Sequence, residues 1–292
     1  MSPITIPTLA EFLAASDEEV AKIAPVTMIY GAGGTRRQAV FEGIEPLSDE
    51  YMRWARKRTI SAVELSFRHG IHNLFTAALR PGNLQEVNRY QDHIIEKTKW
   101  VLAGDEAIAD YRRLGWRVRL LGVDSTSTFY ETAQYLQEVT AKHSQHTLYW
   151  GVVVKTEDPW RQIFTAVQQT GATTQAEAIR VLYGEDIAPA TLSLIFGKPM
   201  VALDIIPPLL IGNLQCYWNQ QPGYRLTQTL LRTVLYDYAY LRRTWRAEKL
   251  ERAQEAIAHR QAWEDGPTLG LGMRLGPFWY PAPMSSSAWL SE

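Results

Sequence analysis

A glycine-rich turn with two adjacent arginines carries the strongest chemical signal in this sequence. It reads Gly31-Ala-Gly-Gly-Thr-Arg-Arg37 and follows a short apolar run. Glycines let a backbone approach a ligand closely, and two neighbouring guanidinium groups can bind a pair of anionic oxygens. A diphosphate fits that arrangement better than a single carboxylate does. The alternative is that Arg36 and Arg37 are solvated residues after a tight turn, and the pattern alone does not choose between the two.

The histidines do not form a recognisable metal site. His69 and His72 flank a predicted helix end, and His143 and His146 lie in a polar stretch. Neither pair has a third ligand nearby in the sequence, whereas a zinc site needs three or four. Hydrogen-bonded or solvated histidines are therefore the default interpretation.

Two aspartates follow strand-like runs. Asp124 and Asp204 are either catalytic carboxylates or simple caps, and capping is the preferred interpretation. Several catalytic motifs are missing from the sequence: a Gly-x-Ser-x-Gly elbow, an Asp-Asp-x-x-Asp or Asp-x-Asp-Asp cluster, and the third glycine of a dinucleotide fingerprint. Serine hydrolysis, the all-helical terpene cyclase architectures and dinucleotide binding are not indicated.

Composition narrows the class of protein. The 292 residues carry 30 Lys+Arg and 31 Asp+Glu, so no global basic field favours nucleic acid as a partner. No apolar run is long enough to span a membrane, and the first residues lack the pattern of a signal peptide. Cys216 is the single cysteine, which excludes a disulfide framework. These features predict a soluble, cytoplasmic globular protein, whose 11% aromatic content can line a large apolar cavity.

Alternating helical and extended patterns must position the glycine-rich turn. A strand is predicted over Val26–Tyr30, directly before the turn, and a helix capped by Ser48 follows and ends near Gly70. Further strands are predicted over Ile71–Leu79, Trp116–Val123, Thr147–Val154, Met200–Ile206 and Leu214–Trp218. Further helices are predicted over Thr8–Ile23, Leu84–Leu114 with a break at Gly104, Phe129–His143, Trp160–Gln169, Gln175–Tyr183 and Thr227–Trp245.

This alternation predicts an α/β fold with an open, mostly parallel central sheet flanked by helices. In such sheets ligands bind beyond the carboxyl ends of the strands, which is where the glycine-rich turn lies. We expect a single catalytic domain over residues 1–265, including a charged helix over Arg246–Glu264. A Gly/Pro/Trp-rich tail over residues 266–292 packs on it or extends from it.

Four motifs point to a known family. They are Gly34-Thr-Arg-Arg37, Asp49-Glu-Tyr51, Phe67-Arg-His-Gly70 and Leu226-Thr-Gln-Thr-Leu-Leu-Arg232, the last continuing as Thr233-Val-Leu-Tyr-Asp-Tyr-Ala-Tyr-Leu-Arg242. Together they resemble the cis-prenyltransferase fold, typified by undecaprenyl diphosphate synthase. Within that fold they resemble the bacterial diterpene synthases and diterpenyl transferases. The likeness extends from about residue 25 to 245, with the middle of the chain matching mainly in pattern.

The resemblance implies a diphosphate site and its residues. It places the isoprenoid diphosphate against Gly33, Gly34, Thr35, Arg36 and Arg37. Arg36 and Arg37 would stabilise the departing diphosphate, and Tyr51 would position water or handle a proton. The alternative for Tyr51 is a packing residue in the first turn of its helix.

One departure from the family concerns the metal. Relatives carry an aspartate just before the Gly-Thr-Arg-Arg run, which helps to hold Mg²⁺, and this sequence has Gly33 there. The resemblance still implies Mg²⁺, but its ligands in this chain are unknown. If the missing acid explains weak metal use, Gly33→Asp is expected to increase the dependence of activity on Mg²⁺.

A second departure concerns chain elongation. The arginine pair that binds a second, homoallylic diphosphate has no clear counterpart, because Lys198 is the only cation between Leu192 and Gln221. Elongation is therefore disfavoured.

Three functions follow from the resemblance. The first is a diterpene synthase that ionises a bicyclic diterpenyl diphosphate of the kolavenyl or tuberculosinyl (halimadienyl) type. Water then captures the allylic cation to give a diterpene alcohol such as kolavelool, and diphosphate is released. The second is a transferase that joins the diterpenyl group to a nucleoside or another acceptor. The third is a non-catalytic subunit.

The late helix also predicts a homodimer. Its apolar positions cover more than the ~100° stripe that one buried face requires; they are Leu226, Leu230, Leu231, Val234, Leu235, Tyr238, Leu241 and Trp245. In folds of this kind the second face contacts the same region of another subunit. The alternative is that the charged helix after Arg246 or the tail covers that face within one chain.

Overall fold

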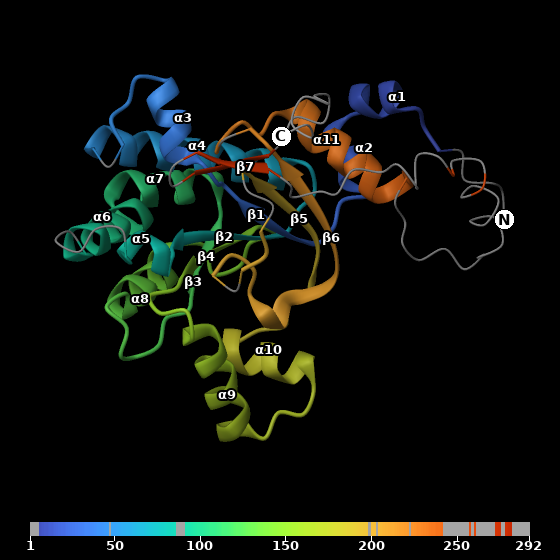
Figure 1. Ribbon diagram of the computed structural model, residues 1–292. Helices are drawn as coiled ribbons and strands as arrows, with labels where there is room; N and C mark the ends of the chain where they lie inside the picture. The colour runs from blue at the N-terminus through green and yellow to red at the C-terminus, as the bar shows by residue number, and fades with distance from the viewer. Residues whose placement is uncertain are drawn as a thin grey trace.

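A six-stranded, fully parallel sheet forms the centre of the computed structural model (Figure 1). The structure describes residues 6–46, 48–85, 91–197, 200–202, 204–221, 223–241, 257, 260, 272–275 and 278–281. The strand order is β3-β4-β2-β1-β5-β6, so β1 lies inside the sheet and β3 and β6 form its edges. The predicted α/β class with an open, mostly parallel sheet is confirmed.

The strands occupy most of the predicted positions. They are β1 (Thr27–Gly31), β2 (Asn73–Leu79), β3 (Arg117–Leu121), β4 (Thr147–Val152), β5 (Ala190–Phe196) and β6 (Ile211–Asn219). The prediction of a strand over Met200–Ile206 is wrong. The amides of Ile205 and Ile206 both donate to the carbonyl oxygen of Ala202 in a turn, and the strand lies earlier, at β5.

Helices cover both faces of the sheet. They are α1 (Leu9–Ala14), α2 (Asp17–Ala21), α3 (Thr35–Phe41), α4 (Asp49–Arg68), α5 (Pro81–Gln85), α6 (Gln91–Ala103), α7 (Asp105–Leu114), α8 (Tyr130–Val139), α9 (Asp158–Thr170), α10 (Gln175–Tyr183), a short η1 (Pro208–Leu210) and α11 (Gln228–Tyr236), which continues as a π-helix η2 (Asp237–Leu241). None of the helices described is both long and apolar enough to cross a membrane.

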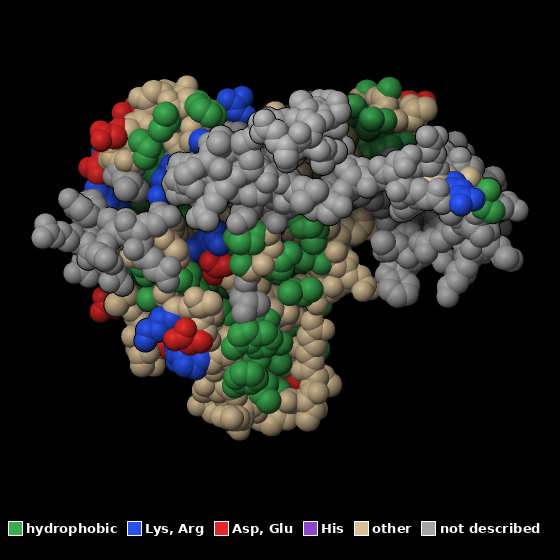
Figure 2. Space-filling view, viewed as in Figure 1, with side chains coloured by type: hydrophobic (Ala, Val, Ile, Leu, Met, Phe, Trp, Pro, Cys, Tyr) green, Lys and Arg blue, Asp and Glu red, His purple; other side chains and the backbone are tan. Residues whose placement is uncertain are grey.

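Alternating strand residues divide the core into two layers. On β4, Leu148 and Trp150 belong to the larger apolar cluster with α4, α6, α7 and α11, whereas Tyr149 belongs to a smaller cluster with α10 and η1. This is the period-two alternation of a strand buried on both faces. Figure 1 shows α9 and α10 set apart from the other helices. In Figure 2, hydrophobic side chains gather over that region, and Trp160 and Phe164 of α9 are 43% and 59% exposed.

The single N-terminal helix predicted over Thr8–Ile23 is wrong, because the structure has two. Thr8 caps α1 and Ser16 caps α2, each in a capping box with the glutamate three residues later. The backbone of Ser16 is extended, and its hydroxyl accepts the amide of Glu19 in the first turn of α2. Ser16 therefore separates the two helices.

Two of the family motifs meet in a buried polar network. The Arg232 guanidinium of α11 donates to His69 Nε2 at 3.0 Å, to the carbonyl oxygens of Leu13 and Ala15 at 2.7 Å, and to Asp17 Oδ1 at 2.6 Å. His69 Nδ1 in turn lies 2.8 Å from the Leu65 carbonyl oxygen, and burial lowers the pKa of the imidazole. His69 and Arg232 therefore tie α4, α11 and the N-terminal helices together and have a structural role.

Part of the apolar surface of α11 is covered within the chain, by α1. Phe12 contacts the rings of Tyr236 and Tyr240 at 5.5 and 5.8 Å, and the Tyr236 hydroxyl donates to the Pro7 carbonyl oxygen. This partner differs from the charged helix and tail considered from the sequence. Trp245, the boundary at residue 265 and all of the predicted helix Arg246–Glu264 except Ile257 and Arg260 lie outside the described residues. Two strands of the tail, β7 (Gly272–Leu275) and β8 (Phe278–Pro281), pair antiparallel.

Candidate active site

The glycine-rich turn lies at the carboxyl end of β1, as predicted. β1 ends at Gly31, and α3 begins at Thr35 after Gly34, which adopts a left-handed conformation with φ of 75°. No side chain caps the first turn of α3. Arg36 and Arg37 lie in that turn, are half-buried and line a large cavity, so they are not simply solvated residues.

Gly33 has no room for a side chain. A Cβ added there would lie closer than 3.0 Å to the carbonyl oxygen of Phe196, at the end of β5. The Gly33 carbonyl oxygen also accepts a hydrogen bond from the amide of Gly223 at 2.5 Å. The loop is therefore packed between the ends of two segments that are distant in the sequence.

Tyr51 faces the loop from the first turn of α4. The hydroxyl of Ser48 accepts the Tyr51 amide at 3.0 Å, which starts the helix there. The Tyr51 and Thr35 hydroxyl oxygens are 2.7 Å apart, and the tyrosine is only 8% exposed. Burial raises the pKa of Tyr51, although the Thr35 hydrogen bond and the charge of Arg36 act in the opposite direction. The phenol is a protonated group that can donate or accept at neutral pH.

These residues line one end of a cavity of about 990 Å³ between the carboxyl ends of the strands and helices α4, α5 and α6. That volume lies at the upper end of the range of roughly 300–1,000 Å³ typical of ligand pockets. The rest of the wall is largely apolar or aromatic and includes Met52, Ala55, Leu79, Ile94, Val101, Trp150, Ile195, Phe196 and Tyr224. The site thus joins a cationic loop to an apolar chamber.

Three further cations line the same cavity and were missed by sequence reasoning. Arg80 follows β2 and pairs with Asp204 at 2.7 Å, Lys97 of α6 pairs with Asp49, and Arg56 of α4 is buried. A signal for Arg80 was present, since a strand-ending arginine before Pro81 lies at the same sheet edge as the glycine-rich turn.

Arg56 differs from the other two cations in its depth. It is 3% exposed, and its guanidinium donates to Asp110 Oδ2 at 2.5 Å and to Glu106 Oε2 at 2.6 Å. Because both carboxylates belong to α7, the arginine fixes α4 against that helix behind the cavity.

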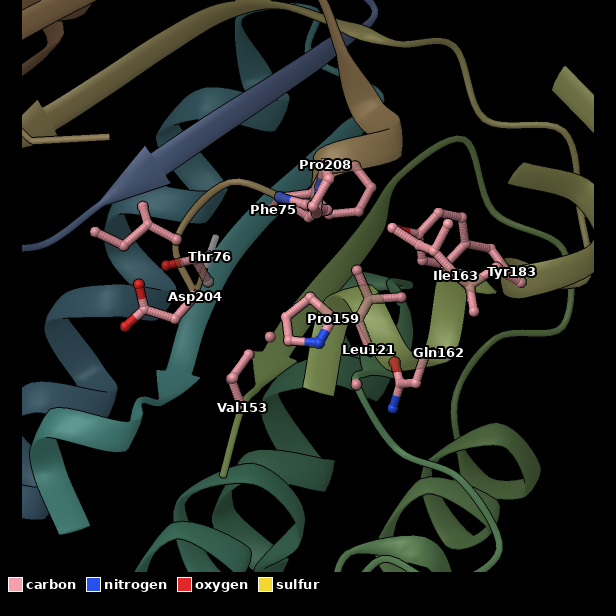
Figure 3. Close-up of a pocket in the computed structure, with 15 residues that line it drawn as sticks. Phe75, Thr76, Leu121, Val153, Pro159, Gln162, Ile163, Tyr183, Asp204 and Pro208 are labelled. Atoms are coloured by element: carbon pink, nitrogen blue, oxygen red, sulfur yellow. The ribbon is translucent and has the colours of Figure 1, made fainter. Parts of the chain in front are cut away.

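A second, smaller cavity of about 50 Å³ lies beside the first and shares Thr76 and Ile205 with it. Figure 3 shows the Asp204 carboxylate next to Thr76 on one side of this cavity and Ile163 and Tyr183 on the other. Its described lining is mostly apolar and includes no lysine or arginine. It is too small and too poor in cations to hold a diphosphate.

The two aspartates considered from the sequence have different roles. Asp124 accepts hydrogen bonds from the amide and hydroxyl of Thr126 at 2.9 and 2.6 Å and lies 3.5 Å from Arg161, so it closes a local turn and does not cap α8, whose N-cap is Phe129. Asp204 instead forms an ion pair with Arg80, so the capping interpretation is wrong for it as well. The ion pair therefore joins Asp204, which lines the smaller cavity, to Arg80, which lines the larger one.

The residues described around this site do not suit a protein-bound Mg²⁺. Mg²⁺ prefers several oxygen ligands, usually including a carboxylate. In the described part of the chain, no group of three His, Cys, Asp or Glu residues is placed to hold a metal ion. Position 33 offers no carboxylate, and Asp204 is already paired with Arg80.

This packing reverses our expectation for position 33. Gly33→Asp or Gly33→Ala must displace the backbone of Phe196, so we expect loss of activity and a destabilisation on the order of 1–3 kcal/mol, typical of overpacking. Neither variant should gain Mg²⁺ dependence. Urea unfolding measures the first effect and a metal titration the second.

Gly82→Ala is the matched control, because nothing lies within 4 Å of a Cβ added there. A stable Gly33→Asp variant with a steeper response to Mg²⁺ would show that the loop can accommodate an acid.

The comparisons with known sequences give two relatives. No family model matches the chain. The chain is 46% identical to (+)-kolavelool synthase of Herpetosiphon aurantiacus over 280 residues, 96% of this chain and 97% of that protein. It is 27% identical to tuberculosinyl adenosine transferase of Mycobacterium tuberculosis over 230 residues, covering 75% and 76% of the two chains.

Solved structures support the fold. Lavandulyl diphosphate synthase from Lavandula x intermedia, in complex with dimethylallyl diphosphate, superposes with a TM-score of 0.59 at 14% identity. A probable undecaprenyl diphosphate synthase from Campylobacter jejuni gives a TM-score of 0.55 at 15% identity. Each covers 75% of this chain and 97% of its own. The parallel sheet, the cationic loop and the apolar cavity agree with the 46% identity over nearly the whole length. The chain therefore belongs to the cis-prenyltransferase-like family of diterpene synthases and transferases that includes (+)-kolavelool synthase.

Proposed function

We propose that this chain is a diterpene synthase that ionises a bicyclic diterpenyl diphosphate, of the kolavenyl or tuberculosinyl type, and captures the allylic cation with water. The product is a diterpene alcohol such as kolavelool, and diphosphate is released. The observation that carries the proposal is the cationic loop at one end of an apolar cavity of about 990 Å³. The 46% identity to (+)-kolavelool synthase supports the same reaction.

Ionisation is the step assigned to the loop. As the C–O bond breaks, negative charge grows on the diphosphate, and donors placed beforehand stabilise it. Arg36 and Arg37 supply the guanidinium groups, and the amides of Gly34 and Thr35 lie beside them. Arg80 adds a third cation on the same cavity wall, already oriented by Asp204.

The cation left behind needs a dry, polarisable chamber. Trp150 and Phe196 present aromatic rings to the cavity, and each cation–π contact is worth roughly 0.5–2 kcal/mol. Tyr51 lies where the chamber meets the loop, since its hydroxyl contacts Thr35. We assign Tyr51 the positioning of water, or the handling of a proton, next to the departing diphosphate.

Product analysis tests the function. The chain is incubated with labelled kolavenyl and tuberculosinyl diphosphates, and the extract is analysed by gas chromatography with mass spectrometry. An alcohol with release of diphosphate supports the synthase. The same assay with adenosine present tests the transferase, which the more distant relative favours. Unchanged substrate in both assays supports the non-catalytic subunit.

Magnesium remains a proposal from the family resemblance. A divalent cation would reach this site bound to the substrate's diphosphate oxygens, because position 33 offers no carboxylate to hold it. Turnover measured in EDTA and over a range of Mg²⁺ concentrations tests this. A saturable requirement for Mg²⁺ supports the metal, and full activity in EDTA rejects it.

We also propose that the enzyme is a cytoplasmic homodimer. The sequence predicts the contact on the helix over Thr227–Trp245, part of which α1 covers within the chain. The edge strand β6 offers a second apolar surface, since Ile211 and Trp218 are 38% and 37% exposed. The free thiol of Cys216 is typical of a reducing compartment. Light scattering at micromolar concentration is expected to give about twice the 33.2 kDa chain mass. A mass near that of one chain rejects the dimer.

A further inference from the structure

A second tyrosine reaches the cavity from a loop late in the chain. Tyr224 follows β6 and lines the cavity together with Tyr51. Its amide donates to Gln38 Oε1 at 2.7 Å, and the preceding Gly223 donates to Gly33. Gly223 has φ of 62°, and a Cβ there would press on Gln38 and Thr35. The backbone that carries Tyr224 is thus fastened to the diphosphate loop.

One carboxylate orders the residues around this tyrosine. Glu42 accepts hydrogen bonds from Gln38 Nε2 at 2.9 Å, Trp54 Nε1 at 2.8 Å and Arg58 at 3.0 Å. The Trp54 ring packs edge-to-face on Tyr224 with centroids 5.3 Å apart, and it lies 5.9 Å from the ring of Tyr51. Glu42 therefore fixes the side chains that hold the Tyr224 backbone and ring.

The hydrogen bonds of the phenol leave its oxygen able to accept. The Thr59 hydroxyl donates to the Ala55 carbonyl oxygen at 3.0 Å, and it is also hydrogen-bonded to Tyr224. Whichever of the two hydroxyls donates, this single bond leaves the Tyr224 oxygen with at least one lone pair. Burial raises the pKa of Tyr224, so the phenol keeps its proton at neutral pH. That lone pair is available to an O–H group in the cavity.

We propose that Tyr224 is a further catalytic residue, which holds the water molecule that captures the diterpenyl cation. This inference rests on the proposed function. The water donates one O–H to the phenol oxygen, and its own lone pair forms the new C–O bond. The proton that the resulting oxonium loses passes to the released diphosphate. Without this water, the cation instead loses a proton from a neighbouring carbon to diphosphate and gives a diene.

The test separates ionisation from capture. Diphosphate release reports ionisation, and the ratio of alcohol to diene reports capture. In Tyr224→Phe, which keeps the aromatic ring, we expect diphosphate release to continue. The alcohol-to-diene ratio should fall roughly three- to tenfold, the size of one lost hydrogen bond. Tyr238→Phe is the matched control, because its hydroxyl bonds Thr191 and it is not among the cavity-lining residues.

A positioning variant provides a second measurement. Glu42→Gln keeps the shape of the side chain but weakens its hold on Gln38, Trp54 and Arg58, so the product ratio should shift in the same direction and less. An unchanged alcohol-to-diene ratio in Tyr224→Phe overturns the role of Tyr224. The proposed function still stands in that case, provided that the wild type makes the alcohol. If the wild type makes no alcohol, both proposals fail.

Discussion

Arg37→Ala is expected to lower kcat by about 10²–10³-fold, the usual cost of removing one donor to a developing anion. The side chain is half-buried in the first turn of α3 and lines the cavity. Its charge is needed most when the diphosphate departs, so the loss should fall on kcat more than on KM. Steady-state release of diphosphate from the diterpenyl substrate measures both constants.

Arg53→Ala is the control for this prediction. Arg53 lies in the first half of α4, is exposed, and is not among the residues that line the cavity. We expect its kcat within a factor of two of wild type, on the order of what surface substitutions cost. An Arg37→Ala enzyme that is folded by circular dichroism and retains near-normal kcat would remove Arg37 from the diphosphate site.

Arg232→Ala is expected to destabilise the fold by about 3–5 kcal/mol, because it leaves a buried charge network without its centre. The arginine side chain is 4% exposed and bonds His69, Asp17 and two carbonyl oxygens at the end of α1. Loss of those bonds frees the N-terminal helices from α11 and leaves buried acceptors without donors. Urea unfolding followed by far-ultraviolet circular dichroism gives the change in free energy.

Arg68→Ala is the matched control, because Arg68 pairs with the same Asp17 at 2.9 Å from the surface, where its side chain is 52% exposed. An exposed pair of this kind is worth about 0–1 kcal/mol. Equal effects of the two substitutions would mean that burial of the network contributes nothing, against the structural role assigned to Arg232.

Local sequence signals were reliable where they depend on a few neighbouring residues. The apolar run into Gly31 predicted β1, and Ser48 with its acidic first turn predicted the start of α4. They failed where competing signals lie close together. Met200–Ile206 is apolar enough for a strand, but its backbone forms turn hydrogen bonds to Ala202, and a further turn follows at Pro207. The strand forms over Ala190–Phe196 instead, as β5.

The sequence by itself determined the α/β class and the glycine-rich turn with Arg36 and Arg37 after β1, because these follow from short motifs, whereas the position of Tyr51 opposite the turn was expected from the family resemblance. Only the tertiary structure decided three further points. Gly33 admits no Cβ because Phe196 of another strand packs on it. Arg80 lines the same cavity as the glycine-rich turn because parallel strands end at one sheet edge. Tyr224 reaches the cavity because Gly33 and Gln38 bind its loop. Each of the three is a contact between segments far apart in the chain, and no local pattern encodes the distance between them.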